Sequence, residues 1–203
     1  MAARQLGARE GTIVSGLYVL QGRPGDALRA CAPLLSAQMA YGDEPINHFA
    51  AVGGTLLGCV SHDHLGQGRM PQYCPETSLW ALFEGSLYDC AAVRNWRQGE
   101  QGPRSDVGIL AALYRAGRLR DVLPDLNGAF FCILYDEKAD KLVACNDRFG
   151  LYPVYWAAGS GGFCMASRVL CAVLGGVVPG DWDPAGVAQL LTTNDFSGDG
   201  TMV

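Results

Sequence analysis

Residues Asp125–Trp156, DLNGAFFCILYDEKADKLVACNDRFGLYPVYW, decide the fold of this chain. Two largely apolar runs within them, Ala129–Tyr135 and Lys141–Cys145, flank a short charged turn. Apolar runs joined by such a turn are typical of a β-hairpin. A second turn leads to the aromatic run Leu151–Ala157, where Pro153 limits a further strand to an edge, a strand start or an irregular position.

This stretch resembles the core hairpin of the glutamine-hydrolysing, class II amidotransferase domain at the N-terminus of asparagine synthetases. The resemblance is carried by a leucine, a glycine and a phenylalanine, an aromatic-Asp strand end, then Asp-Arg-x-Gly and Pro-x-Tyr. These residues are Leu126, Gly128, Phe130, Tyr135, Asp136, Asp147, Arg148, Gly150, Pro153 and Tyr155. The resemblance implies an α+β fold, a four-layer αββα sandwich of two antiparallel sheets between helices, as in Ntn hydrolases.

Composition sets further bounds on the class of protein. With 203 residues, 49% hydrophobic and 17% charged, the chain can fill one core and predicts a single globular domain. The net charge of −5 and the scattered Lys and Arg residues argue against a nucleic-acid partner. No apolar run approaches the ~20 residues that span a bilayer, so we expect no membrane partner and a cytoplasmic location.

The metal-ligating residue types do not form a clear site. None of the eight cysteines shows C-x-x-C spacing, which favours small buried hydrophobic side chains over zinc or disulfides. His62 and His64 would share one face of a strand, and a metal pair is one reading of them. Only Asp63 and His48 lie near, so a solvated loop is favoured, and we expect no metal and no cofactor.

Helical periodicity and capping residues predict the remaining elements. Arg23–Ala40 has the pattern of a helix, with a break or kink at Pro33. Leu79–Leu87 is typical of a strand, and Gly161–Leu174 of a strand followed by a short helix. Trp182-Asp183-Pro184 is placed to cap a helix that runs through Leu191.

The strand TIVSGLYVL, Thr12–Leu20, resembles the first strand of class II amidotransferases. Aligning its Ser-Gly-Leu-Tyr ending on the family places Thr12 where the family has its nucleophilic cysteine. In the family that cysteine is the first residue, and its own α-amino group acts as the base. Thr12 has no thiol, and eleven residues precede it, so we expect 1–11 to be an irregular lead-in and 12–203 the domain.

The family signature Asn-Gly-Glu-Ile-Tyr-Asn is matched in outline by Glu84–Asp89. The resemblance implies that Glu84 and Gly85 stand at the oxyanion-hole positions, where the family uses an asparagine side chain and a glycine N–H. Losing one such donor typically costs about 2.7–4 kcal/mol in the barrier, and an ionised carboxylate would repel the developing charge. Ser86 stands where the family has a glutamate that contacts the substrate's amino group.

Two further positions correspond to substrate-binding residues of the family. Ser61 stands where the family has an arginine that grips the α-carboxylate of glutamine, a contact that needs a charged, planar fork. Asp106 matches an aspartate that binds the amino group of glutamine. Because Ser105-Asp106 precedes the apolar pattern Val107–Ala116, Asp106 is also explained by stabilisation of a helix N-terminus.

The resemblance therefore implies a class II amidotransferase-like domain of an asparagine-synthetase-like protein. We expect this domain to have lost glutaminase activity and to have a structural or partner-docking role. Because no Ser-Gly-Gly-x-Asp-Ser loop occurs, we expect these residues to lack the ATP-using synthetase domain. The expected partner is then an asparagine-synthetase-like ATP-using domain or subunit, and a homodimer is the alternative. The alternative is an active amidohydrolase, either with Thr12 exposed by cleavage after Gly11 or with a misaligned cysteine, Cys31 or Cys59.

Overall fold

The computed structural model describes most of the chain. The described residues are 16–38, 46–61, 70–74, 78–88, 91, 93–94 and 105–194. Thr12, His62, Asp63 and His64 lie outside them, and so does the lead-in 1–11.

One antiparallel sheet has five strands in the order β2-β3-β1-β9-β8. Its first strand in the chain, β1, lies in the middle, between β3 and β9. The strands are β1 (Gly16–Gln21), β2 (Ile46–Val52), β3 (Thr55–Ser61), β8 (Tyr155–Gly159) and β9 (Gly162–Ala166).

The second antiparallel sheet has the order β4-β5-β6-β7. Its strands are β4 (Gln72–Cys74), β5 (Leu79–Leu87), β6 (Gly128–Asp136) and β7 (Lys141–Asn146). The predicted hairpin is confirmed as β6 and β7, with Asp136 paired to Lys141 beside the turn. In the four-residue turn between them, the backbone N–H groups of Lys138 and Ala139 donate hydrogen bonds to the Asp136 carboxylate and hold the turn closed.

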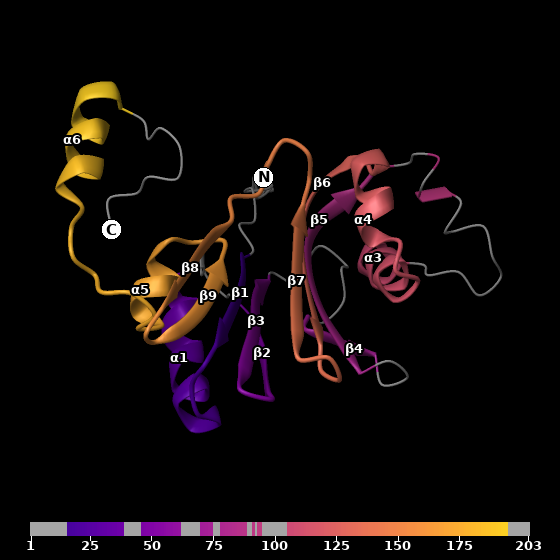
Figure 1. Ribbon diagram of the computed structural model, residues 1–203, viewed down its shortest axis with the longest axis horizontal. Helices are drawn as coiled ribbons and strands as arrows, with labels where there is room; N and C mark the ends of the chain where they lie inside the picture. Colours follow the sequence, from indigo (N-terminus) through magenta and orange to yellow (C-terminus); the bar gives the residue numbers. More distant parts are fainter. Residues whose placement is uncertain are drawn as a thin grey trace, which may run out of the picture.

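Helices cover the outer faces of the two sheets, which gives the expected four layers (Figure 1). On the five-stranded sheet lie α1 (Gly25–Ala37) and α5 (Leu170–Leu174). On the other side of the molecule, α3 (Asp106–Arg115), α4 (Leu119–Val122) and the 3-10 turn Leu123–Asp125 cover the four-stranded sheet. The predicted αββα sandwich is therefore confirmed.

Side chains that alternate along β1 divide the buried core into two clusters. Leu17 and Val19 of β1 face the second sheet and join a large buried cluster with Leu82 and Ile133. Tyr18 and its neighbour Leu20 face the other way, into a cluster with α1 and α5. The two sheets therefore pack face to face, and each residue of β1 has a fixed side.

Two predicted elements differ from the observed ones. Helix α1 continues through Pro33 without a break, because the buried face Leu28, Ala32 and Leu35 packs on the sheet and offsets the cost of the proline. The strand predicted after the second turn begins later than expected, at Tyr155, but the limit set by Pro153 is confirmed, because β8 is an edge strand and Pro153 lies before it in an irregular connector.

Helix α6 (Pro184–Thr193) stands apart from the two sheets in Figure 1. As predicted, Asp183 caps it, accepting from the backbone N–H of Ala185 at 3.0 Å. Only Gly186 of this helix is buried, and Leu191 is 80% exposed. No helix in the described ranges is long and apolar enough to cross a membrane.

Candidate functional site

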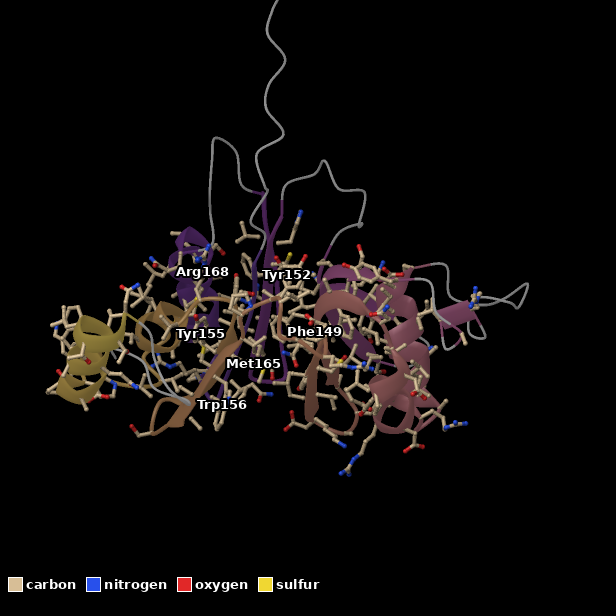
Figure 2. The ribbon with its side chains drawn as sticks, turned by 90° about the horizontal axis from the view of Figure 1, so that it is seen from above. Phe149, Tyr152, Tyr155, Trp156, Met165 and Arg168 are labelled. Carbon is tan, nitrogen blue, oxygen red and sulfur yellow. The ribbon has the colours of Figure 1, made fainter. Side chains whose placement is uncertain are left out.

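The fold brings most of the predicted site positions to one end of the sandwich. Ser61 is the last residue of β3 and lies one residue beyond the pair Gly16–Val60, where β1 begins. Its side chain lies outside the described part, as does Thr12, four residues before Gly16. Figure 2 shows the molecule from above, with Tyr152 labelled near its middle.

Glu84 lies inside the molecule rather than on its surface. It faces Phe131 across the β5–β6 ladder, and only 6% of it is exposed. The charge of Glu84 raises the pKa of two neighbours, Cys59 on β3 and Tyr152 on the connector, in each case after the larger effect of burial. The carboxylate therefore lies between the two sheets, close to a buried thiol and a phenol.

Gly85 has a backbone that only glycine accommodates easily. Its φ is +104°, and a Cβ at this position would lie 2.0 Å from the carbonyl oxygen of Ala129. The neighbouring Ser86 pairs with Ala129 and is exposed. The positive φ and the close carbonyl oxygen therefore explain why this position of the family signature is a glycine.

Asp106 joins the start of α3 to the end of β5. Its Oδ2 accepts a hydrogen bond from the backbone N–H of Leu87 at 2.8 Å. The N-cap itself is Ser105, whose side chain accepts from Gly108 N–H, so the predicted capped helix is confirmed. The contact with Leu87 holds Asp106 beside Ser86. One continuous region therefore contains Asp106 and the β5 residues Glu84, Gly85 and Ser86.

The sequence did not place two residues, Cys59 and Tyr152, beside Glu84. Burial raises the pKa of Cys59 to about 12, with a smaller contribution from Glu84. Tyr152 responds to Glu84 and also to Asp147 and Tyr88. The sequence could have shown that Cys59 shares a strand face with Leu57, but its position opposite β5 depends on how the sheets stack.

No metal site is found in the part of the chain that the structure describes. No group of three or more His, Cys, Asp or Glu side chains gathers there in a way that could hold a metal ion. His48 lies on β2, and the predicted pair His62 and His64, with Asp63, lies outside the described residues.

Comparisons with known proteins agree with the fold. Residues 59–173 match the family model described as "Glutamine amidotransferase domain". Among curated proteins, "Amidase chry2" of Gibberella zeae is 26% identical over 67% of this chain and 20% of its own length. A "Putative asparagine synthetase [glutamine-hydrolyzing]" of Mycobacterium tuberculosis is 27% identical over 60% of this chain and 20% of its own length.

A solved structure supports the same fold. The glutamine phosphoribosylpyrophosphate amidotransferase of B. subtilis superposes with a TM-score of 0.63 at 16% identity, over 80% of this chain and 44% of that one. The present chain spans about a fifth of the length of these curated relatives. The matched family model covers more than half of the chain, which therefore belongs to the class II glutamine amidotransferase domain family, related to asparagine synthetases and amidases.

Proposed function

We propose that this domain is a non-catalytic class II amidotransferase-like unit of an asparagine-synthetase-like protein, with a structural and docking role. The observation that carries the proposal is Glu84. A buried carboxylate stands where the family resemblance requires a donor to the oxyanion, and a negative charge there destabilises the tetrahedral intermediate of amide hydrolysis.

A misaligned cysteine has little support among the described residues. Cys59 is buried and its pKa is raised to about 12, so at neutral pH it is a protonated thiol and a weak nucleophile. Cys31 lies on α1, in the cluster between that helix and the five-stranded sheet, on the opposite face from Glu84. Cleavage after Gly11, which would expose Thr12, lies outside the described residues and remains the enzymatic alternative.

The test is a glutaminase assay on the full chain after its intact mass has been measured. We expect a chain that keeps residues 1–11 and releases no ammonia from glutamine above the rate without protein. Glutamine-dependent ammonia release that Thr12→Ala abolishes and Gly25→Ala leaves unchanged would overturn the proposal. Gly25 is a suitable control because a Cβ there meets nothing within 4 Å.

The docking role is supported by exposed apolar side chains on the segment 147–156, which leads from β7 to β8. Phe149 is 77% exposed and Trp156 is 68% exposed, and Leu151 is also exposed. We name these three residues the connector surface. Figure 2 labels Phe149 near the middle of the molecule and Trp156 on the side of α5 and α6. Contiguous exposed apolar groups mark protein interaction surfaces, and these three residues belong to one short segment of the chain.

The connector surface is held on a rigid backbone. The buried Asp147 carboxylate accepts from the backbone N–H groups of Phe149 at 2.9 Å and Leu151 at 3.1 Å. The side chains above it are therefore presented without a large ordering cost on binding, which favours a role as interface anchors.

The occupant we propose is an ATP-using domain or subunit of an asparagine-synthetase-like protein. The support is the length of the relatives, of which four fifths lies beyond the matched region. Two arginines are exposed near these residues in the chain: Arg148 precedes Phe149, and Arg168 follows β9, the strand that pairs with β8. We therefore expect the complementary face to be apolar with an acidic rim.

Binding to a purified ATP-using domain from the same source tests this role. Phe149→Ser and Trp156→Ser are each expected to weaken the complex at least about tenfold, because buried aromatic anchors dominate interface energies. Leu191→Ser removes an equally exposed apolar side chain from α6 and is expected to change nothing. A complex that survives both connector variants, or a homodimer that both disrupt, would contradict the proposed partner.

A further inference from the structure

Two cysteines face each other across the β6–β7 hairpin. Cys132 and Cys145 are Cα partners in the antiparallel ladder, and both are free thiols. Directly opposed residues share one face of a sheet. The two side chains influence each other's protonation: each thiol contributes to the pKa shift of the other, upward for Cys132 and downward for Cys145.

The register gives the geometry of this pair. The backbone N–H of Asp147 donates to the carbonyl of Phe130 at 2.9 Å, which makes those two residues a hydrogen-bonded pair. Because hydrogen-bonded pairs recur at every second position, Cys132–Cys145 is also of this type. Its Cα atoms are then about 5.5 Å apart, inside the range of about 4.4–6.8 Å that disulfides require.

The direction of its pKa shift distinguishes Cys145 from Cys59, Cys164 and Cys171. Burial raises the pKa of Cys59, Cys164 and Cys171 to about 12 in each case. The interaction with the Cys132 side chain instead lowers the pKa of Cys145, while burial raises that of Cys132. Cys145 also lies on β7, an edge strand of the four-stranded sheet, which can open locally more easily than a central strand.

We propose that Cys132 and Cys145 are an oxidation site that closes to a reversible disulfide in the presence of a hydroperoxide. This inference is independent of the proposed docking function, since it depends only on the hairpin.

The reaction proceeds in two balanced steps. The Cys145 thiolate attacks one oxygen of hydrogen peroxide, so an S–O bond forms as the O–O bond breaks, and the leaving hydroxide takes up a proton to become water. The Cys132 sulfur then attacks the Cys145 sulfur, and an S–S bond forms as the S–O bond breaks. The Cys132 proton leaves with that oxygen as a second water. The two thiols are oxidised together by two electrons, and the peroxide is reduced by two.

The resulting bond is expected to be strained and easily reduced. Cβ atoms of directly opposed residues are about 4.5–5.5 Å apart, and closer in non-hydrogen-bonded pairs, whereas a relaxed disulfide needs about 3.5–4.5 Å. The edge strand must therefore shift when the bond closes, and strained disulfides are the labile ones.

The test oxidises the reduced full chain with hydrogen peroxide, blocks remaining thiols with iodoacetamide, and maps peptides without reduction. We expect a peptide pair joined through Cys132 and Cys145 with the loss of two hydrogen atoms. Reduced glutathione should remove the link from the folded protein. Cys164→Ala should leave the link intact, and Cys145→Ala should leave Cys132 alkylated once the protein is unfolded.

Three outcomes would overturn the proposal. One is that both cysteines stay fully alkylated at peroxide concentrations that oxidise the more accessible Cys74. Another is that Cys132 or Cys145 is found joined to a different cysteine. A link that forms but resists glutathione until the chain is unfolded would overturn its reversible character.

Discussion

At the scale of single residues, the tightest packing in the core lies between Tyr18 and Gly58. The two residues face each other in the β1–β3 ladder, and a Cβ on Gly58 would lie 1.9 Å from the Cζ atom of Tyr18. The phenol is fully buried and forms a hydrogen bond with Ser36 at 3.1 Å. The absent side chain of Gly58 therefore makes room for an aromatic ring.

Replacing Gly58 with alanine is expected to lower the free energy of unfolding by about 3 kcal/mol, because the Tyr18 ring must move and its buried hydrogen bond is disturbed. Urea unfolding measures the change. Gly25→Ala, in the first turn of α1, adds the same methyl group in open space and should be neutral or stabilise by up to about 1 kcal/mol. Equal effects for the two variants would show that the ring does not fill this space.

At the scale of elements, a single carboxylate organises the passage from one sheet to the other. Besides Phe149 and Leu151, Asp147 accepts from the backbone N–H of Phe130 at 3.3 Å, so it connects β6 to the start of the connector. The backbone carbonyl of Asp147 also accepts from Gly150, whose φ of +61° suits glycine. The Asp-Arg-x-Gly pattern is thus a loop anchor.

Asp147→Ala is expected to destabilise the protein by about 2–4 kcal/mol, because it leaves buried amide groups without their acceptor. Hydrogen exchange should accelerate at the Phe149 and Leu151 amides. Asp183→Ala removes an exposed helix cap and should cost only about 1 kcal/mol, with changes confined to α6. Unchanged exchange at Leu151 in the Asp147 variant would contradict the anchoring role.

Elements were predictable where the signal is local. The β6–β7 hairpin follows from two apolar runs and one charged turn, and the cap of α3 follows from Ser105. The continuation of α1 through Pro33 was not predictable, because a buried face in tertiary contact outweighs the local preference of proline. The late start of β8 follows a local rule instead, since Pro153 cannot donate a hydrogen bond to the strand ladder.

At the scale of the whole molecule, both sides of the five-stranded sheet contain groups whose protonated form is favoured by folding. Burial raises the pKa of Cys59, Cys164 and Cys171 from 9.0 to about 12, and that of Tyr18 from 10.0 to about 12. Each group binds its proton more tightly in the folded chain than in the unfolded one. Its contribution to stability is complete below its unfolded pKa and declines as the pH rises toward 12.

The free energy of unfolding is therefore expected to fall by several kcal/mol between pH 8 and pH 10.5, since each pKa unit corresponds to about 1.4 kcal/mol. Urea unfolding of the reduced protein at both values measures the change. Cys164→Ala removes one of the four groups and should make the dependence on pH shallower. A free energy of unfolding that rises between pH 8 and pH 10.5 would contradict the raised pKa values of these four buried groups.

The arrangement of the site shows what a sequence leaves open at this scale. The resemblance could name Glu84 and Asp106 because each belongs to a local pattern. It could not place Cys59 and Tyr152 beside Glu84, since they come from different sheets and connectors. Nor could it pair Cys132 with Cys145, because that contact depends on the register of the hairpin by a single residue.

The central position of β1 also affects how the domain can be made by the ribosome. β1 pairs on one side with β9, and Leu17 exchanges hydrogen bonds with Ser167, 150 residues later in the chain. Until β9 has been synthesised, β1 has an unpaired edge in the middle of an apolar sheet, a situation that favours aggregation. Release of a nascent chain that ends before Gly162 would therefore leave an incomplete sheet, and folding must wait for nearly the whole domain.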